Sequence, residues 1–402
     1  MARAYDVMCA GHLCLDIIPR FPDTGARQIA EIMRPGKLVN IEEATLSTGG
    51  PVSNTGMNLQ VLGLEVCFCA RTGRDVFGEL TIDLLRGEGN ADGVHVVDGV
   101  PSSYTIAIAP PHIDRIFLHN PGTNNVFSPD DLDPELVAQC RHFHFGYPPL
   151  MRGMYENDGA GLDAVFRIAK AAGATTSCDM TLPDPASISG RTNWRRILEK
   201  ILPNMDLYLP SVEETFFMLE PEAFLRMKEK HDNADLIDFL TPEDYARLAD
   251  TCLSMGAKAV SLKTGHRGFY LKTGEAAHFA ALGAVGPGHP ANWSSRELWA
   301  PAFRPPVFGS ATGSGDSAIA GLLAAFLRGL RIETALKYAT CLGLQNVQVL
   351  DAVSGIQSWE ETTHLLQEDL PLLDAHIAAQ GWHWSTEHGL WAGPADPLSQ
   401  GS

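Results

Sequence analysis

Clusters of positive charge are missing from this chain. Its 402 residues carry 30 Lys and Arg against 48 Asp and Glu, a formal net charge of -18, and no block of basic residues occurs. Nucleic acids and anionic membranes are therefore poor partners, because both attract proteins through basic patches. Any phosphate-binding site must be local, built from backbone amides and a few cations.

Long apolar runs are missing as well, and the first residues lack the pattern of a signal peptide. Eight cysteines are present without a C-x-x-C pair, scattered among apolar residues. We expect buried, reduced thiols and a cytoplasmic protein. A zinc site is not expected, since zinc takes three or four protein ligands, whereas His142 and His144 share a strand face without a third partner.

Short apolar strands alternate regularly with capped helices along much of the chain. This alternation predicts βαβ units, and so an α/β fold with a mostly parallel sheet between helices. The G-x-G-x-x-G spacing of dinucleotide-binding folds does not follow the first strand. Strands are expected at 5–11, 65–70, 142–146, 175–179, 207–209 and 258–262. Helices are expected at 52–62, 79–86, 162–172, 194–202 and 242–255.

The first half of the chain holds regions outside this alternation. Residues 20–47 show no helical period, and residues 104–109 and 115–118 are two strands joined by a short connection. Both regions fit a small flap or lid. Residues 90–93, with the sequence N-A-D-G, are expected to form a turn.

The second half holds further irregular regions. Residues 220–238 are expected to form a surface helical insert, and residues 283–301, rich in Gly, Pro and Ser, a long loop. Residues 269–271 and 277–279 are expected to pair as a hairpin. The tail from residue 380 contains three tryptophans, which leaves packing on the surface, an oligomer contact or disorder open.

Residues 310–321 carry the strongest chemical signal. Gly313 and Gly315 bracket a small residue and precede an apolar helix former, so an anion can sit at the helix N-terminus. Asp316 lies at the rim of this positive end, where a carboxylate can serve as a general base beside a phosphate. The alternative is a Gly-rich turn capped by Asp316.

A second glycine pair precedes the predicted helix at 52–62. Gly49 and Gly50 allow a ligand to approach the backbone, and Asn54 falls in the first helical turn. Asp16, which lies between apolar residues, is either an outward-facing strand residue or a site residue. Ligands of such sheets bind outside the carboxyl ends of the strands, so we expect polar residues at strand ends and helix starts to meet in one crevice. These are Asp16, Asn54, Asp179, Thr264 and Asp316. Tyr147 also follows a strand and can line a pocket, but the pattern assigns it no role.

Two sequence signatures, and their order along the chain, resemble those of the PfkB, or ribokinase-like, family of carbohydrate kinases. The first is G-G-P-V-S-N-T-G-M-N-L-Q-V-L-G at residues 49–63, followed by R-T-G-R-D-V-F-G at residues 71–78. The second, usually written D-T-T-G-A-G-D, is S-A-T-G-S-G-D at residues 310–316. The resemblance extends from the first strand to about Trp359.

The resemblance implies a three-layer α/β/α sandwich with a mostly parallel central sheet and a small β-sheet lid. The whole chain, 1–402, is expected to form a single kinase domain. The lid segments are expected at about 13–48 and 97–118, and the inserts at about 220–240 and 283–301. Homodimerisation through the lid is a further implication.

The resemblance also implies ATP-dependent phosphorylation of a hydroxyl on a sugar or sugar-like molecule, with Mg²⁺. Asp316 is expected to be the catalytic base, and Gly313, Ser314 and Gly315 the anion hole. Substrate contacts are implied for Asp16, Gly49, Gly50 and Asn54. Nucleotide contacts are implied for Lys263, Thr264, Gly265 and Gly268. A nucleoside kinase and a non-catalytic sugar or nucleotide sensor are the alternatives.

Three positions depart from the family pattern. The N-x-x-E motif linked to magnesium keeps its acid as Glu214 but has Ser211 in place of the asparagine. Ser310 stands where many members have a carboxylate of a monovalent-cation site, so a potassium site is not supported. Pro51 replaces a lysine common in ribokinases proper, so ribose is not favoured over other sugars.

Overall fold

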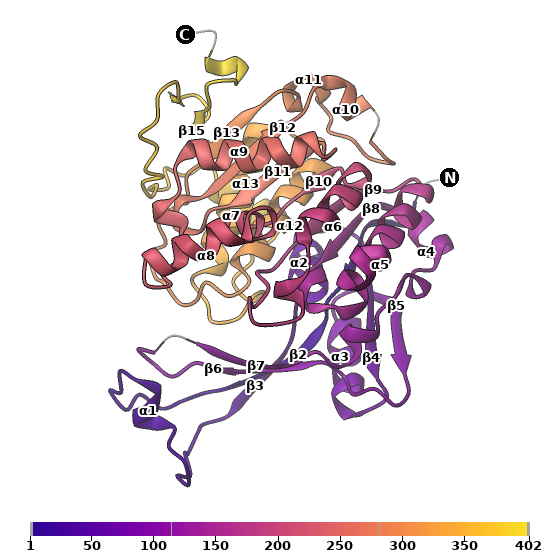
Figure 1. Ribbon diagram of the computed structural model, residues 1–402, viewed down its shortest axis with the longest axis vertical. Helices are drawn as coiled ribbons and strands as arrows, with labels where there is room; N and C mark the ends of the chain where they lie inside the picture. The colour runs from indigo at the N-terminus through magenta and orange to yellow at the C-terminus, as the bar shows by residue number, and fades with distance from the viewer. Residues whose placement is uncertain (1–2, 114, 281, 400–402) are drawn as a thin grey trace.

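The computed structural model describes residues 3–113, 115–280 and 282–399, and a single large sheet runs through its centre (Figure 1). The strand order is β14-β15-β13-β12-β11-β10-β9-β8-β1-β4-β5. Seven neighbouring strands, from β5 to β11, pair in parallel, and the four beyond β11 pair antiparallel. The strands are β1 (Tyr5–Gly11), β4 (Val66–Gly73), β5 (Asn90–Val97), β8 (Cys140–Gly146), β9 (Thr175–Asp179), β10 (Leu207–Tyr208), β11 (Ala259–Lys263), β12 (Phe269–Thr273), β13 (Glu297–Ala300), β14 (His383–Ser385) and β15 (Leu390–Ala392).

Helices cover both faces of this sheet because its strands are apolar on both sides. Along β1, Val7 and Cys9 belong to one apolar cluster, and Met8 and Ala10 belong to another. The first cluster includes residues of α2 (Pro51–Val61), α3 (Val76–Arg86), α12 (Ser314–Leu327) and α13 (Ile332–Asn346). The second includes residues of α5 (Arg152–Ala171), α6 (Trp194–Ile201), α7 (Val212–Leu219) and α9 (Pro242–Ser254). The shorter helices are α1 (Ile29–Ile32), α4 (Pro134–Ala138), α8 (Pro221–Lys230), α10 (Ala276–Ala280), α11 (Pro290–Trp293) and α14 (Trp359–Leu365). The predicted three-layer fold is confirmed.

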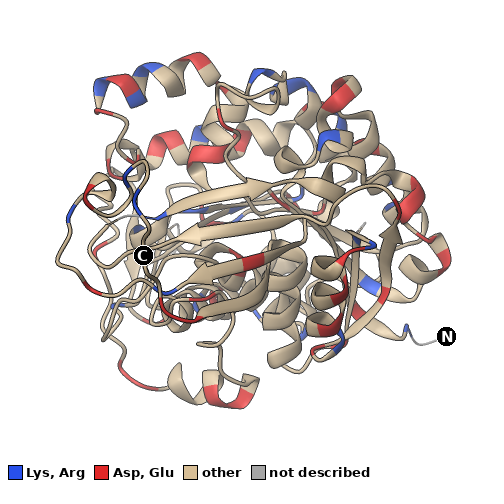
Figure 2. Cartoon of the chain, turned by 90° about the horizontal axis from the view of Figure 1, so that it is seen from below, with Lys and Arg blue, Asp and Glu red and all other residues tan. Residues whose placement is uncertain are grey.

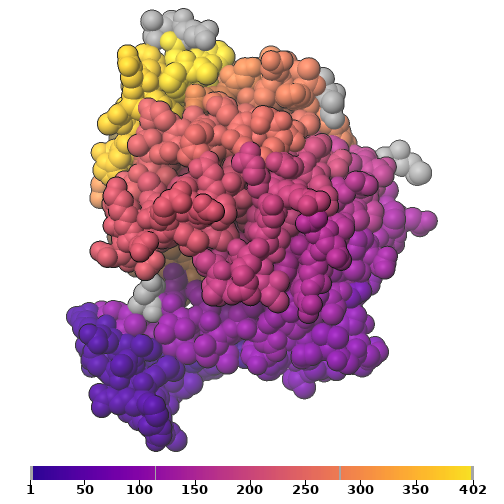
Figure 3. Space-filling model, in the orientation of Figure 1, coloured from indigo at the N-terminus to yellow at the C-terminus, as the bar shows by residue number. Residues whose placement is uncertain are grey.

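A second, four-stranded sheet projects from the body of the molecule (Figures 1 and 3). Its order is β3-β2-β6-β7, and its strands overlap the segments 13–48 and 97–118 that were expected to form a lid. The strands are β2 (Cys14–Pro19), β3 (Ala44–Gly49), β6 (Tyr104–Ile108) and β7 (Ile116–Asn120). The outer pairs are antiparallel, and the central pair β2–β6 is parallel.

Two local predictions fail because strand pairing overrides local signals. The predicted turn at 90–93 is the start of edge strand β5, where Gly93 is needed because a Cβ there would lie 2.7 Å from the carbonyl oxygen of Phe68. Residues 277–279 do not pair with β12; they lie in α10, and β12 pairs with β11 and β13 instead.

The predictions for the inserts and tail have mixed outcomes. The segment at 220–238 does contain a helix, α8. The predicted loop at 283–301 is wrong, since it contains α11 and β13, whose side chains Leu298 and Trp299 are buried in the main sheet. The tail adds β14 and β15 beside β13.

Charged side chains lie mainly on the outer helices and loops, whereas the central strands are largely uncharged (Figure 2). The eight cysteines are free and buried, which confirms the prediction for them. Among the described residues, no helix has the length and apolar character needed to cross a membrane.

Candidate active site

The glycine loop at residue 313 forms the N-terminus of α12. Gly313 is the N-cap residue with φ 74°, and a Cβ there would lie 2.3 Å from the Cβ of Ala352. Glycine is therefore required both for its backbone conformation and for space. Asp316 belongs to the first helical turn and makes no capping bond, so the alternative of a turn capped by Asp316 is wrong. The loop leaves a positive helix end next to a carboxylate.

Asp316 is 1% exposed and is held by two side chains from distant parts of the chain. Asn54 Nδ2 donates to its Oδ2 at 2.8 Å, and the Tyr147 hydroxyl lies 3.1 Å from both carboxylate oxygens. Burial raises the pKa of Asp316, while the bond from Asn54, the charge of Lys263 and the bond from Tyr147 oppose this shift. A carboxylate with a raised pKa is suited to accept a proton.

Local backbone geometry brings these two partners to Asp316. Gly50, with φ 87°, is the N-cap of α2, Pro51 follows at the first helical position, and the Asn54 amide donates to the Gly50 carbonyl at 2.8 Å. Tyr147 follows β8 with φ 58°, a left-handed conformation that is uncommon for a non-glycine residue. This backbone conformation was not visible in the sequence, which marked Tyr147 as a residue that can line a pocket but assigned it no role.

Lys263, at the end of β11, is surrounded by carboxylates. It forms an ion pair with Asp179, and its Nζ would lie 3.4 Å from a Cβ at Gly315, so it also faces the glycine loop. Burial disfavours the charged amine, but Asp179 and then Glu214 outweigh this and raise the pKa of Lys263. The lysine is therefore a fixed positive charge beside the helix end.

Glu214 and Ser211 close the N-terminus of α7 with a capping box. The Ser211 amide donates to Glu214 Oε2 at 2.6 Å, and the Glu214 amide donates to Ser211 Oγ at 3.3 Å. Ser211 thus serves as the helix cap at the position where the family has asparagine. Burial raises the pKa of Glu214, opposed by Lys263.

The predicted nucleotide turn connects β11 to β12. The Thr264 amide donates to the Gly268 carbonyl at 3.0 Å, and Gly265 and Gly268 have φ 54° and 103°. The hydroxyl of Thr264 is buried without a hydrogen-bond partner. Gly268 packs against β13, where a Cβ would lie 2.0 Å from the Ala300 carbonyl oxygen. Packing alone therefore requires a glycine at this position.

On the small sheet, one row of paired residues is polar. The row runs across the four strands, each residue pairing with the next, and consists of Ser47, Asp16, Thr105 and His119. Cys14 Sγ lies 3.3 Å from Asp16 Oδ1, and Asp16 packs so closely on Gly49 that a Cβ there would lie 2.1 Å from Asp16 Oδ2. Burial raises the pKa of Asp16 to about 6.

His12 is a further polar residue that the sequence analysis did not single out. Its Nε2 lies 3.3 Å from Nε2 of His119, and its buried Nδ1 has no hydrogen-bond partner. Burial, and then the charge of His119, lower the pKa of His12 to about 3, so the ring is neutral at pH 7. Its position after Gly11 at the first strand end was the available signal.

The donor set fits a magnesium ion that arrives with a nucleotide. Within the described residues, no three or more His, Cys, Asp or Glu side chains are grouped to hold a metal alone. Asp179 Oδ2 is nevertheless buried without a protein partner, in a cluster with Glu214. Mg²⁺ usually binds one or two carboxylates plus substrate phosphates and waters, which matches this arrangement.

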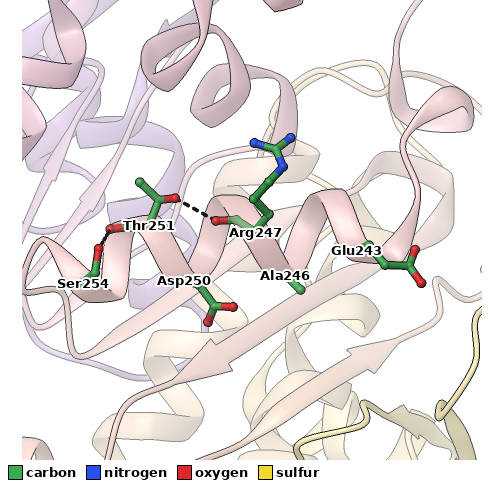
Figure 4. A pocket seen from close by; sticks show the side chains of 6 residues that line it. All are labelled: Glu243, Ala246, Arg247, Asp250, Thr251 and Ser254. Carbon is green, nitrogen blue, oxygen red and sulfur yellow. Dashed lines mark hydrogen bonds between the residues drawn. The ribbon is translucent and has the colours of Figure 1, made fainter.

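A surface hollow of about 570 Å³ lies elsewhere, beside α9. It is lined by Glu243, Ala246, Arg247, Asp250, Thr251 and Ser254, which project from this helix (Figure 4). Its lining includes none of the candidate site residues. The hollow is therefore not part of the site around Asp316.

Comparison with known proteins finds a family match over most of the chain. A family model described as "pfkB family carbohydrate kinase" matches residues 5–359. The chain belongs to the pfkB family. It is a sugar or nucleoside kinase that uses ATP.

Relatives within this family share modest sequence identity with the enzyme. An uncharacterised sugar kinase of Archaeoglobus fulgidus is 24% identical over 69% of this chain and 89% of its own length. A probable fructokinase-3 of Arabidopsis thaliana is 29% identical over 34% of this chain and 40% of its own length. The structure of a putative ribokinase II from E. coli in complex with ATP and Mg²⁺ is 19% identical, covers 90% of this chain and 99% of its own, and has a TM-score of 0.66. That structural similarity shows the shared fold.

Proposed function

We propose that this pfkB-family enzyme transfers the γ-phosphoryl group of ATP to a sugar hydroxyl, with Asp316 as the general base. The observation that carries this proposal is the position of Asp316: buried, with a raised pKa, in the first turn of α12 directly behind the glycine loop. Asn54 and Tyr147 fix its carboxylate, which supports a positioned base.

In the proposed reaction, the sugar oxygen attacks the γ-phosphorus while Asp316 accepts the hydroxyl proton. A new O–P bond forms, the bond to the bridging oxygen of ATP breaks, and ADP leaves. Amides of Gly313, Ser314 and Gly315 stabilise the charge of the transferred group together with Lys263. Positioning and charge stabilisation supply most of the catalysis in such transfers.

The nucleotide side is assigned to Lys263, Thr264, Gly265 and Gly268. Lys263 offers a charge, and the buried hydroxyl of Thr264 offers a donor without a protein partner. Magnesium would lie near Glu214 and Asp179 and neutralise phosphate charge. The positive charge of Lys263 limits repulsion between these acids and the phosphates.

The acceptor side is assigned to Asp16 and Gly49 on the small sheet, which acts as a lid, and to Gly50 and Asn54 at the start of α2. A fructose-like sugar is the first candidate, because curated relatives include fructokinases. A nucleoside is the second, because the rings of His12 and His119, with centroids 5.1 Å apart, offer a surface for a base.

A coupled assay of ADP release across ketohexoses, aldoses, sugar acids and nucleosides tests this proposal. Turnover with a ketohexose above that with nucleosides supports the sugar assignment. Turnover with nucleosides alone supports the second candidate, and binding without any turnover would overturn the kinase mechanism.

Sugar binding is expected to weaken in acid because Asp16 must be ionised to accept hydroxyl hydrogen bonds. Its pKa is raised to about 6, so kcat/KM for the sugar should fall about tenfold per pH unit below 6. The same shift means that Asp16 contributes stability below about pH 4, which is lost as pH rises towards 6. Steady-state kinetics from pH 5 to 8 measure the first effect, and a profile without an inflection near 6 would contradict it.

Homodimerisation through the lid is also expected. An apolar row crosses the four strands on the face opposite Asp16 and consists of Leu46, Ile17, Ile106 and Leu118. Its two outer residues, Leu46 and Leu118, are 47% and 51% exposed. Leu118→Glu should convert a dimer to a monomer in light scattering, because it places a charge in an apolar contact. Thr45→Glu, an exposed position on the same sheet, is the control. An unchanged mass for Leu118→Glu would argue against this interface.

A further inference from the structure

A hydrogen bond joins the small sheet to the glycine loop. Arg115 Nη1 donates to Ser310 Oγ at 2.6 Å, although the residues are 195 positions apart. Arg115 immediately precedes β7, and Ser310 begins the loop that leads to Gly313. In Figure 1 the β6–β7 hairpin runs along the small sheet, below the body of the molecule. The contact therefore brings a lid side chain to the phosphoryl-transfer end of the site.

Ser310 is well placed to hold this guanidinium. The serine is buried, and its Oγ also accepts a hydrogen bond from the Thr312 amide at 3.0 Å. Its own amide donates to the Val347 carbonyl at 3.2 Å, which ties the loop to the end of α13. Arg115 thus binds a fixed point three residues from the N-cap of α12.

The negative charge of the site suggests a role for this arginine in binding phosphate. In the described part of the chain, the carboxylates of Asp179, Glu214 and Asp316 share the charge of the buried Lys263, which already pairs with Asp179. A nucleoside triphosphate brings several further negative charges into this cluster. A guanidinium binds phosphate oxygens through paired N–H donors, so Arg115, bound at Ser310, can supply a second cation next to the glycine loop.

We propose that Arg115 is a phosphate-binding residue that the small sheet delivers to the γ-phosphate of the bound nucleotide. The proposal rests on the proposed kinase site and adds a residue to it. The same sheet carries Asp16, linked through Thr105 to His119 on β7, where Thr105 Oγ1 lies 3.0 Å from His119 Nδ1. Sugar and nucleotide therefore engage one rigid element, and each should tighten the binding of the other.

Calorimetric titration with AMP-PNP and with AMP, both in excess Mg²⁺, tests this role without requiring the sugar. Arg115→Met should weaken AMP-PNP binding about 10- to 100-fold and leave AMP binding unchanged, because a charge-assisted bond to the γ-phosphate is lost. Arg20→Met removes an exposed arginine from the same small-sheet region and should match the wild type for both ligands. Ser310→Ala keeps the guanidinium and should lose less affinity for AMP-PNP than Arg115→Met.

The outcomes separate this proposal from the proposed function. If the wild type binds AMP-PNP and Arg115→Met binds it equally well, Arg115 does not contact the phosphates. If Arg115→Met and Ser310→Ala weaken AMP and AMP-PNP alike, the contact only fastens the lid, and the proposal is wrong. If the wild type binds neither nucleotide, the kinase site itself is refuted.

Discussion

Asp316→Asn is expected to lower turnover about 10²- to 10⁴-fold, the range that a positioned general base contributes. The amide keeps the size of the side chain and can still accept the hydrogen bond from Asn54, but it cannot take the hydroxyl proton. The binding of AMP-PNP should be preserved, because the glycine loop and Lys263 are untouched. The effect should appear in kcat rather than in KM.

The lower turnover of Asp316→Asn is not expected to come from unfolding of the variant. Burial raises the pKa of Asp316, which means that the folded state is penalised for holding the ionised carboxylate at neutral pH. Removing the charge should therefore leave the melting temperature equal or higher, as at other sites where function costs stability. Turnover by Asp316→Asn above about one tenth of the wild-type rate would show that another group accepts the proton.

Tyr147→Phe is the informative comparison, because it retains the base and removes one of its two partners. Without the phenol, the Asp316 carboxylate keeps the hydrogen bond from Asn54. The turnover of Tyr147→Phe should therefore fall far less than that of Asp316→Asn. A similar loss in both variants would mean that Tyr147 takes part in the chemistry itself.

The two glycine loops could be predicted from the sequence because their signals are local. A glycine pair at a helix start, followed by a carboxylate in the first turn, is a feature of consecutive residues, and both glycine loops lie where the pattern placed them. Whether these residues perform the proposed roles is the question that the variants above address.

The contacts that these residues make depend on tertiary pairing and left no local signal. Tyr147 reaches Asp316 through a left-handed backbone conformation, and Arg115 reaches Ser310 through the extension of a hairpin. His12 meets His119 only because β2 and β7 lie on either side of β6. Periodicity cannot report such contacts, since each joins elements that the chain order separates.

Two strands of the large sheet, β5 and β13, were mispredicted for a related reason. Residues 90–93 contain turn-forming types, yet β4 pairs with them, and the region around β13 is rich in Gly, Pro and Ser, yet its short apolar stretch completes the sheet. β5 accepts such residues because it is an edge strand, and one of its sides needs no partner. β13 is paired on both sides, with β12 and β15, and there long-range pairing outweighs the loop-like composition around it. Composition alone therefore favoured loops there.

Arg296→Met is expected to destabilise the enzyme by about 3–5 kcal/mol, the usual cost of breaking a buried ion pair. Arg296, 4% exposed, precedes β13 and bonds two buried acids: Glu333 at 2.7 Å and Asp396 at 2.8 Å. Asp396 belongs to the tail and also accepts the Glu297 amide at 2.9 Å. Without the arginine, the two buried carboxylates of Glu333 and Asp396 lose the guanidinium that bonds both of them.

Arg331→Met is the matched control. Arg331 lies 3.6 Å from the same Glu333 but is 55% exposed, so its loss should cost about 1 kcal/mol or less. Both variants are compared with the wild type by urea denaturation at pH 7.5. An equal loss of unfolding free energy in the two would contradict the assignment of Arg296 as the central charge.

The pH dependence separates lost charge pairing from lost packing. In the wild type, burial alone would raise the pKa of Glu333, but hydrogen bonds from Asn292 and Arg296 lower it, so this group contributes stability at neutral pH that is lost in acid. In Arg296→Met the pKa should instead rise, and protonation then relieves the penalty as pH falls. The difference in unfolding free energy between the two proteins should therefore narrow from pH 7.5 to 5. A difference that stays constant over this range would mean that Arg296 stabilises the tail by packing its aliphatic stem, and not by neutralising the two acids.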